Sequence, residues 1–263
     1  MDGPARIAPG REAGEAVNIL ETKGLSVEFS GFKALTDLDF SLEEGELRVI
    51  LGPNGAGKTT LMDLITGKTK PTAGRIRFKG RDITGMDTHA IARIGIGRKF
   101  QGPHLFDNMT VEENLQVAFQ GWHAPGKALL FRKTKKFRER MEEILTLIHL
   151  QDKAPQFAGS LSHGEKQWLE MGMLLAQDPE LIILDEPTTG MTAEETFRTG
   201  QLIETLFRGR SIIVIEHDMA FVRQVARKVT VLHQGRLLAE GTLQEIENDA
   251  RVQEVYLKED SHA

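Results

Sequence analysis

The most constraining feature of this chain is one nine-residue stretch, Gly52-Pro53-Asn54-Gly55-Ala56-Gly57-Lys58-Thr59-Thr60. It fits the pattern G-x-x-x-x-G-K-[ST]. The apolar run 47–51 predicts a buried strand before it, and the spacing of apolar residues over 61–65 predicts a helix that stops at Gly67. The glycines of such a loop let backbone N–H groups turn inward around a phosphate. An ordinary Gly-rich turn is the alternative, but the motif and its context agree.

Two side chains of this stretch add to the backbone. The following helix start carries a partial positive charge that favours an anion. Lys58 is placed to reach the β- and γ-phosphates of a nucleotide, and the Thr59 hydroxyl to ligate Mg²⁺. The sequence therefore predicts a site for nucleotide phosphates and Mg²⁺.

Composition excludes several classes of protein. A length of 263 residues suits one α/β domain with an appended subdomain, and a net charge of −5 gives no nucleic-acid signature. The chain has no cysteine, so disulfides and thiol chemistry are excluded. No apolar run approaches the roughly 18 residues of a membrane span. Residues 1–16 lack a signal-peptide pattern and are predicted to be a disordered leader. Because neither a membrane span nor a signal peptide is predicted, a role at a membrane would need a partner.

Polar residues follow two other predicted strands. The apolar strand 181–184 ends in Asp185 and Glu186, and carboxylates at such a place need partners or a task. Beside a phosphate loop, the task is Mg²⁺ binding for Asp185 and water activation for Glu186. The strand 211–215 is followed by His217, for which we favour a phosphate contact over a structural role.

An antiparallel portion precedes the phosphate loop. Residues 17–29 and 34–42 alternate apolar and polar positions and predict two strands around a Ser30-Gly31 turn. Phe29 and Phe32 flank this turn. We favour stacking on a nucleotide base for Phe29 and ordinary core packing for Phe32.

The region from 104 to about 178 is predicted to be mostly helical. Ser162 and Glu165 have capping-box spacing, so Ser162 is placed at a helix start. Such a start is either a second anion site or simply a well-capped helix, and spacing alone favours the second. For the basic run 132–140, a solvated helix face is favoured over a face toward lipid headgroups.

The order of these motifs resembles that of an ABC-transporter ATP-binding subunit, from about residue 17 to 256. The resemblance is carried by the phosphate loop, Gln101, Leu161-Ser162-His163-Gly164-Glu165, 181–186 and His217. In this order, the Ser-x-Gly sequence favours the anion site for Ser162. Tracts such as 45–50, 95–101, 161–170 and 190–192 are similar to UrtD-type subunits of urea importers, and 251–257 is similar to both these and branched-chain amino acid importers.

The resemblance implies a fold class and its boundaries. The expected fold is α/β: a P-loop NTPase core with an antiparallel β-subdomain and an inserted α-helical subdomain. The core with its β-subdomain would span 17–102 and 179–263. The helical subdomain would span 103–178, carry the Ser-x-Gly signature and receive the permease.

The resemblance also implies roles for individual residues. Three residues are assigned to catalysis: Glu186, which is the general base, and also His217 and Gln101. Mg²⁺ ligation is assigned to Thr59, Gln101 and Asp185. ATP binding is assigned to Phe29 at the adenine, to Gly52, Pro53, Asn54, Gly55, Ala56, Gly57, Lys58, Thr59 and Thr60 at the phosphates, and to Ser162 and Gly164 at the γ-phosphate of ATP held by another subunit.

The implied function is ATP hydrolysis that energises a membrane importer of a small solute, namely urea, with a branched-chain amino acid as the alternative. The implied partners are permease subunits, a second ATP-binding subunit of the same or another sequence, and indirectly a solute-binding protein, at the cytoplasmic face of the membrane. A soluble ABC ATPase of DNA repair or translation is disfavoured, because such proteins usually carry two ATP domains or a long coiled coil and this sequence shows neither. A non-hydrolysing regulator is disfavoured by the intact Lys58, Asp185, Glu186 and His217.

Three residues depart from the family pattern. His163 replaces the second glycine of the signature, and its imidazole is expected to point away from the phosphate unless the site is reshaped. Glu165 replaces a glutamine and is expected to fold back on the helix start. Thr192 replaces an aspartate in the loop after the carboxylate pair, which removes a charged contact across the dimer.

Overall fold

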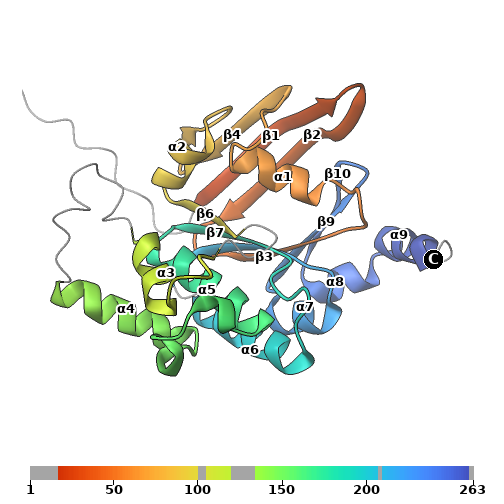
Figure 1. Cartoon of the computed structure of the whole chain (residues 1–263). Coiled ribbons are helices and arrows are strands. Elements are labelled where there is room, and N and C mark those ends of the chain that lie inside the picture. The colour runs from red at the N-terminus through yellow and green to blue at the C-terminus, as the bar shows by residue number, and fades with distance from the viewer. Residues whose placement is uncertain (1–16, 100–104, 120–133, 207–208, 261–263) are drawn as a thin grey trace, which may run out of the picture.

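The computed structural model describes residues 17–99, 105–119, 134–206 and 209–260 (Figure 1). The strands form two sheets, a four-stranded sheet with the order β2-β1-β4-β5 and a six-stranded sheet with the order β10-β9-β3-β8-β7-β6. The smaller sheet lies above one face of the larger sheet, with α1 between them, and helices α3 to α7 cover the other face. This is the α/β arrangement with an antiparallel sheet and a helical region that the sequence predicts.

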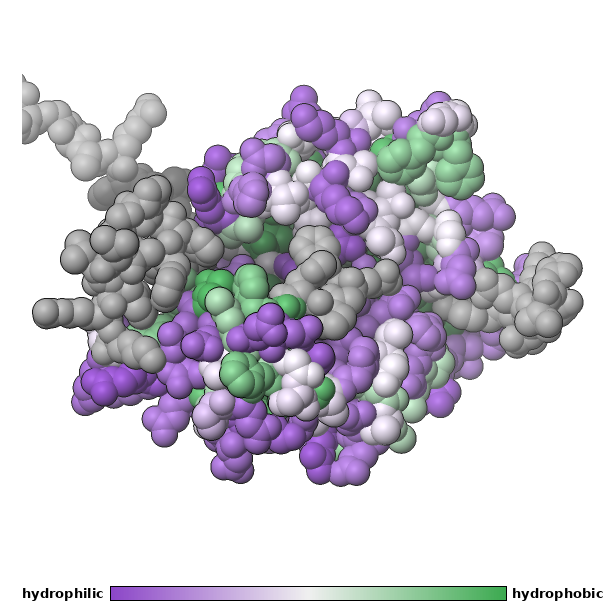
Figure 2. All heavy atoms as spheres, in the orientation of Figure 1, coloured by the Kyte–Doolittle hydropathy of each residue, from purple (hydrophilic) through white to green (hydrophobic). Residues whose placement is uncertain are grey.

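The four-stranded sheet is antiparallel. It consists of β1 (Asn18–Phe29), β2 (Phe32–Glu43), β4 (Ala73–Phe78) and β5 (Arg81–Asp82). Phe29 pairs with Phe32 across the predicted turn, and both rings are exposed, by 47% and 67%. Figure 2 shows a hydrophobic patch at the upper right, over this tip of the hairpin. The core packing favoured for Phe32 is therefore wrong, because the ring lies at the exposed tip of the β1–β2 hairpin.

The centre of the six-stranded sheet is parallel. Its strands are β3 (Leu47–Leu51), β6 (Ile96–Lys99), β7 (Leu181–Asp185), β8 (Ser211–Ile215), β9 (Lys228–His233) and β10 (Arg236–Gly241), of which β9 and β10 form an antiparallel hairpin. Every residue of β3, β7 and β8 is buried, as expected of parallel strands covered on both faces. Ile215 lies opposite both Ile50 and Asp185, so these three strands end at one edge of the sheet.

Two hydrophobic clusters form the core, one on each face of the six-stranded sheet. Alternate residues of β3 enter different clusters: Val49 and Leu51 face the helices, while Ile50 faces the smaller sheet. The second cluster includes α1 (Lys58–Ile65) and Ile91 of α2 (Thr88–Arg93). Because α1 follows β3 directly, this packing fixes the loop between them.

The helices between β6 and β9 cover the other face. They are α3 (Val111–Ala118), α4 (Lys135–Leu147), α5 (His163–Ala176), α6 (Ala193–Leu206) and α7 (Met219–Val225), with short 3-10 turns at Gln151–Lys153 and Ala158–Ser160. Helices α3, α4 and α5 approach closely at Gly172, where a Cβ would lie 2.7 Å from Ile148 and 3.0 Å from Leu115. This packing holds α5 tightly against α3 and α4.

The C-terminal segment consists of two helices. They are α8 (Leu243–Asn248) and α9 (Ala250–Asp260), separated at Asp249, which has extended dihedral angles. The Asp249 carboxylate accepts a hydrogen bond from the Arg251 backbone N–H at 2.8 Å and so caps the second helix.

Three predictions lie wholly or partly outside the described residues. These are the disordered leader 1–16, the position of Gln101, and the first two residues, 132 and 133, of the basic run. Within the described ranges, no helix has both the length and the apolar character to cross a bilayer.

Candidate nucleotide-binding and catalytic site

The loop between β3 and α1 is packed so closely that only glycine fits at two of its positions. Gly52 and Gly57 have φ angles of +148° and +101°, in the region that favours glycine. A Cβ on Gly52 would lie 2.2 Å from the Leu232 carbonyl oxygen, and one on Gly57 would lie 2.6 Å from Leu35 Cδ2. The loop is therefore packed between the end of β9 and β2.

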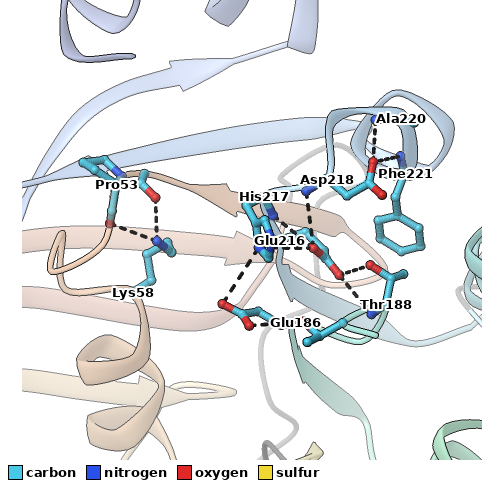
Figure 3. Close-up of polar contacts among 11 residues, drawn as sticks. Pro53, Lys58, Glu186, Thr188, Glu216, His217, Asp218, Ala220 and Phe221 are labelled. Carbon is cyan, nitrogen blue, oxygen red and sulfur yellow. Dashed lines mark hydrogen bonds and ion pairs between the residues drawn. The ribbon is translucent and has the colours of Figure 1, made fainter. Parts of the chain in front are cut away.

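The start of α1 carries positive charge. Its N-cap is Gly57, which has no side chain to cap the helix. The first backbone N–H groups of α1 therefore remain available to donate to another acceptor. The Lys58 ammonium folds over the loop and donates to the carbonyl oxygens of Gly52 and, at 3.0 Å, Pro53 (Figure 3). Thr59 and Thr60 lie in the first turn of the same helix. A cation beside the N–H groups of a helix start suits a phosphate group.

Asp185 lies at the end of β7 and is 1% exposed. Its Oδ2 accepts a hydrogen bond from Arg98 Nη2 at 2.7 Å, and the same guanidinium forms an ion pair with Asp63 on α1. The Asp185 Oδ1 atom is buried and has no hydrogen-bond partner among the described residues. A buried carboxylate oxygen in this state needs a partner, and a divalent cation is one that fits.

Glu186 follows Asp185 in a left-handed backbone conformation, with φ +48°. This conformation is uncommon for a residue other than glycine and is a form of strain that occurs at functional sites. The Glu186 N–H donates to the Ile215 carbonyl at 2.9 Å, which fixes the backbone. The carboxylate Oε1 lies 3.9 Å from His217 Nδ1, and Oε2 accepts from the Thr189 hydroxyl at 3.2 Å (Figure 3).

Glu216 is a site residue to which sequence reasoning gave no role. Its carboxylate is buried and accepts hydrogen bonds from the backbone N–H groups of Thr188 and His217, both at 3.0 Å, and from the Thr188 hydroxyl (Figure 3). It thereby joins the loop after β7 to the loop after β8. The available signal was an acidic residue at the end of a buried strand beside Asp185.

These strand ends face a cavity of about 810 Å³. Six predicted site residues line it: Gly52, Pro53, Asn54, Lys58, Glu186 and His217. Its remaining wall comes from β3, α7 and the two C-terminal helices, through Leu51, Met219, Arg223, Leu243, Ile246, Glu247, Val252 and Gln253. Phe29, Ser162 and Gly164 are not among the described residues that line it.

The start of α5 is a second, separate region. Ser162 is its N-cap and accepts from the Glu165 N–H at 3.3 Å, while Glu165 accepts from the Ser162 N–H at 3.0 Å. This confirms the predicted capping box and the folding back of Glu165. Partial burial raises the pKa of Glu165, but an ion pair with Lys153 at 2.5 Å and the Ser162 bonds outweigh it and bring the pKa below its ordinary value.

The fold and the sheet edge define a protein of the P-loop type that binds nucleotide phosphates. A family model described as "ABC transporter" matches residues 35–189, more than half of the chain. The chain belongs to the ABC transporter family, and it is an ATPase. The fold class predicted from the sequence is confirmed.

The similar proteins share nearly the whole length of the chain. The high-affinity branched-chain amino acid transport ATP-binding protein LivG of Salmonella typhimurium is 38% identical over 253 residues, covering 92% of this chain and 98% of LivG. The corresponding protein BraF of Pseudomonas aeruginosa is 37% identical over 252 residues, covering 92% of this chain and 98% of BraF.

Solved structures agree with this assignment. A nucleotide-free ATP-binding cassette from an ABC transporter is similar with a TM-score of 0.79 and 32% identity, covering 91% of this chain and 98% of that one. A dimeric ATP-binding cassette in a post-hydrolysis state, bound to ADP and Pi, is similar with a TM-score of 0.71 and 25% identity, covering 85% of this chain and 98% of that one.

Proposed function

We propose that this chain is the ATP-hydrolysing subunit of a membrane importer and that it works as a head-to-tail dimer. The observation that carries this proposal is the separation of its two anion-binding regions. Gly52, Pro53, Asn54, Lys58, Glu186 and His217 line one cavity, whereas Ser162 is exposed and is not among the described residues that line it. In the proposed dimer, ATP binds between the phosphate loop of one subunit and Ser162 and Gly164 of the other. The dimeric, ADP-bound cassette among the similar structures supports this arrangement.

The residues around Asp185 fit a Mg²⁺ ion. Asp185 Oδ1 and the Thr59 hydroxyl are the proposed ligands, with Gln101 as a third. When bound, the ion supplies charge compensation for the phosphates. Arg98 holds the other Asp185 oxygen, so the carboxylate is oriented before any ion arrives.

The catalytic roles follow from what each side chain can donate or accept. Lys58 neutralises phosphate charge, and His217 contacts the γ-phosphate. Glu186 accepts a proton from the attacking water, and its backbone and its Thr189 contact keep the carboxylate at the cavity wall. Phe29, exposed at the hairpin tip, stacks on the adenine.

For the transported solute, we propose a branched-chain amino acid. The similar proteins LivG and BraF carry that substrate class in their names, and they match almost the whole chain. They favour the second alternative of the sequence analysis over urea. An ATP-binding subunit does not touch the solute, so side-chain chemistry does not discriminate between the two.

The partners in this proposal are permease subunits, which place the chain at the cytoplasmic face of the membrane, a second ATP-binding subunit and, indirectly, a solute-binding protein. The helical region 103–178 is proposed as the subdomain that receives the permease.

The test is solute-stimulated ATPase activity of the chain assembled with its permease subunits and binding protein in lipid vesicles. Leucine is expected to stimulate hydrolysis and urea is not, and the Glu186→Gln complex serves as the negative control. Stimulation by urea alone would overturn the proposed solute. A lack of ATP hydrolysis with every solute would overturn the proposed function.

A further inference from the structure

His163, the first residue of α5, lies against the loop that follows the carboxylate pair. Its Nε2 atom is 3.1 Å from the Thr189 carbonyl oxygen and 3.3 Å from Gln167 Nε2. A ring with its proton on Nε2 donates to the carbonyl, which can only accept. The imidazole thus turns toward its own chain, as one alternative of the sequence analysis expected.

The residues that follow His163 and Thr189 are both glycines, Gly164 and Gly190, and each lies close to a neighbouring segment. Gly190 has φ +78°, and a Cβ there would lie 3.0 Å from His163 Nε2. A Cβ on Gly164 would lie 2.3 Å from Glu195 Oε1, and Glu195 in turn accepts from the Thr192 N–H at 2.9 Å. The start of α5 therefore packs closely against the loop 187–192 at Gly190 and against the first turn of α6 at Glu195.

The loop 187–192 has two anchors, and one of them reaches Glu186. On the buried side, Thr188 is bonded to Glu216. On the exposed side, the Thr189 carbonyl is bonded to His163, and the Thr189 hydroxyl donates to Glu186 Oε2 at 3.2 Å. Two hydrogen bonds, both made by Thr189, therefore connect the His163 ring to the Glu186 carboxylate.

We propose that His163 is a positioning residue for ATP hydrolysis: by holding the Thr189 carbonyl, it links the start of α5 to the orientation of the Glu186 carboxylate in the same chain. This inference rests on the proposed function, in which Ser162 binds the nucleotide held by a second subunit. Ser162 adjoins His163, so phosphate at Ser162 fixes the ring that orients Glu186. Each nucleotide site then influences the general base of the other site through one continuous chain.

The kinetic test compares His163→Leu with His163→Gln. Leucine cannot donate to Thr189, whereas the glutamine amide can. We expect kcat for ATP hydrolysis to fall by about fivefold in His163→Leu, as for one lost hydrogen bond, with KM changed by less than about twofold. We expect His163→Gln to recover most of the loss. His89→Leu, at an exposed position on α2, is the matched control and keeps the original kcat.

A double-mutant cycle separates a positioning role from a merely structural one. Thr189→Val removes the hydroxyl bonded to Glu186 but keeps the carbonyl bonded to His163. If the two contacts form one route, the combined His163→Leu and Thr189→Val variant loses less kcat than the product of the single losses. Independent losses, or equal loss in His163→Gln and His163→Leu, would overturn the inference.

Hydrogen–deuterium exchange of the full-length chain supplies a readout that does not need a dimer. Peptides covering 186–192 are expected to exchange at least about threefold faster in His163→Leu than in the original chain, because local opening loses one restraint. Unchanged exchange there would overturn the contact. If instead the original chain shows no ATP-driven association, the dimer of the proposed function fails, and this inference fails with it.

Discussion

The end of the six-stranded sheet and the start of α5 are the two proposed anion sites, yet they are built differently. At the sheet edge, the loop 52–57 has glycines in conformations that side chains avoid, and Asp185 is buried beneath it with one oxygen unpartnered among the described residues. At α5, Ser162 is exposed, and its backbone and side chain are satisfied by a capping box. The first region faces a cavity of about 810 Å³, whereas Ser162 is not among the described residues that line it.

This difference indicates what each region needs before it can work. The sheet edge is preorganised by strain and buried charge, which the surrounding fold stabilises. The start of α5 is capped and exposed, and in the proposed dimer the second subunit encloses the anion there. The comparison predicts that substitutions at the sheet edge act within one subunit, while substitutions at α5 act between subunits.

The largest effect is expected for Glu186→Gln. Removal of the general base should lower ATP turnover by about 10²–10⁴-fold, while ATP binding is retained because the phosphate loop is unchanged. Steady-state phosphate release measures turnover, and a fluorescent nucleotide measures binding. The control is Glu204→Gln on the exposed face of α6, which removes the same charge. Unchanged turnover in Glu186→Gln would show that another group activates the water.

A smaller effect, confined to association, is expected for Ser162→Arg. The added side chain should block closure and lower ATP-driven dimerisation by at least about tenfold, because a bulky cation replaces a close contact. Light scattering measures dimerisation. The nucleotide affinity of the monomer should stay within about twofold. Thr205→Arg, an exposed residue of α6, is the matched control. Loss of monomer affinity in Ser162→Arg would contradict the separation of the two regions.

The smallest effect concerns the capping box of α5. Because the pKa of Glu165 in the folded protein lies below its ordinary 4.5, Glu165 stabilises the fold above about pH 4.5, and this stabilisation is lost as the pH falls through the folded-state value. At pH 7, Glu165→Gln should lower the unfolding free energy by about 0.5–1 kcal/mol, mainly through the lost Lys153 pair. Urea denaturation at pH 7 and pH 3.5 measures this difference.

A matched capping box provides the control for this last prediction. Glu245 caps α8 with Thr242 in the same way, and these hydrogen bonds also lower its pKa, but no lysine pairs with it in the described part of the chain. Glu245→Gln should therefore cost less than Glu165→Gln at pH 7. Equal costs would mean that Lys153 contributes nothing.

The sequence predicted those features of the fold and the site that depend on local pattern. Short-range spacing and apolar runs predict the parallel strands, the loop 52–57 and the capping box at Ser162. For the same reason, the ends of β7 and β8 could be assigned polar tasks before their order in the sheet was known.

The features that were missed depend on long-range contacts. The bonds from Glu216 to Thr188 and from His163 to Thr189 join segments more than 20 residues apart in the chain, and only the strand order brings them together. The exposed ring of Phe32 was not predicted either, because the sequence alone does not show which hairpin tips stay uncovered.

Arg98 has a consequence for the part of the cycle in which no nucleotide is bound. Every ATPase empties its site once per turnover, and an empty site would leave Asp185 as a lone charge inside the sheet. The guanidinium is already paired with Asp185 and Asp63, so β7 and α1 keep a common counter-charge at that moment. ADP and phosphate can therefore leave without a rearrangement of β7 and α1, and the next nucleotide binds to the same surface.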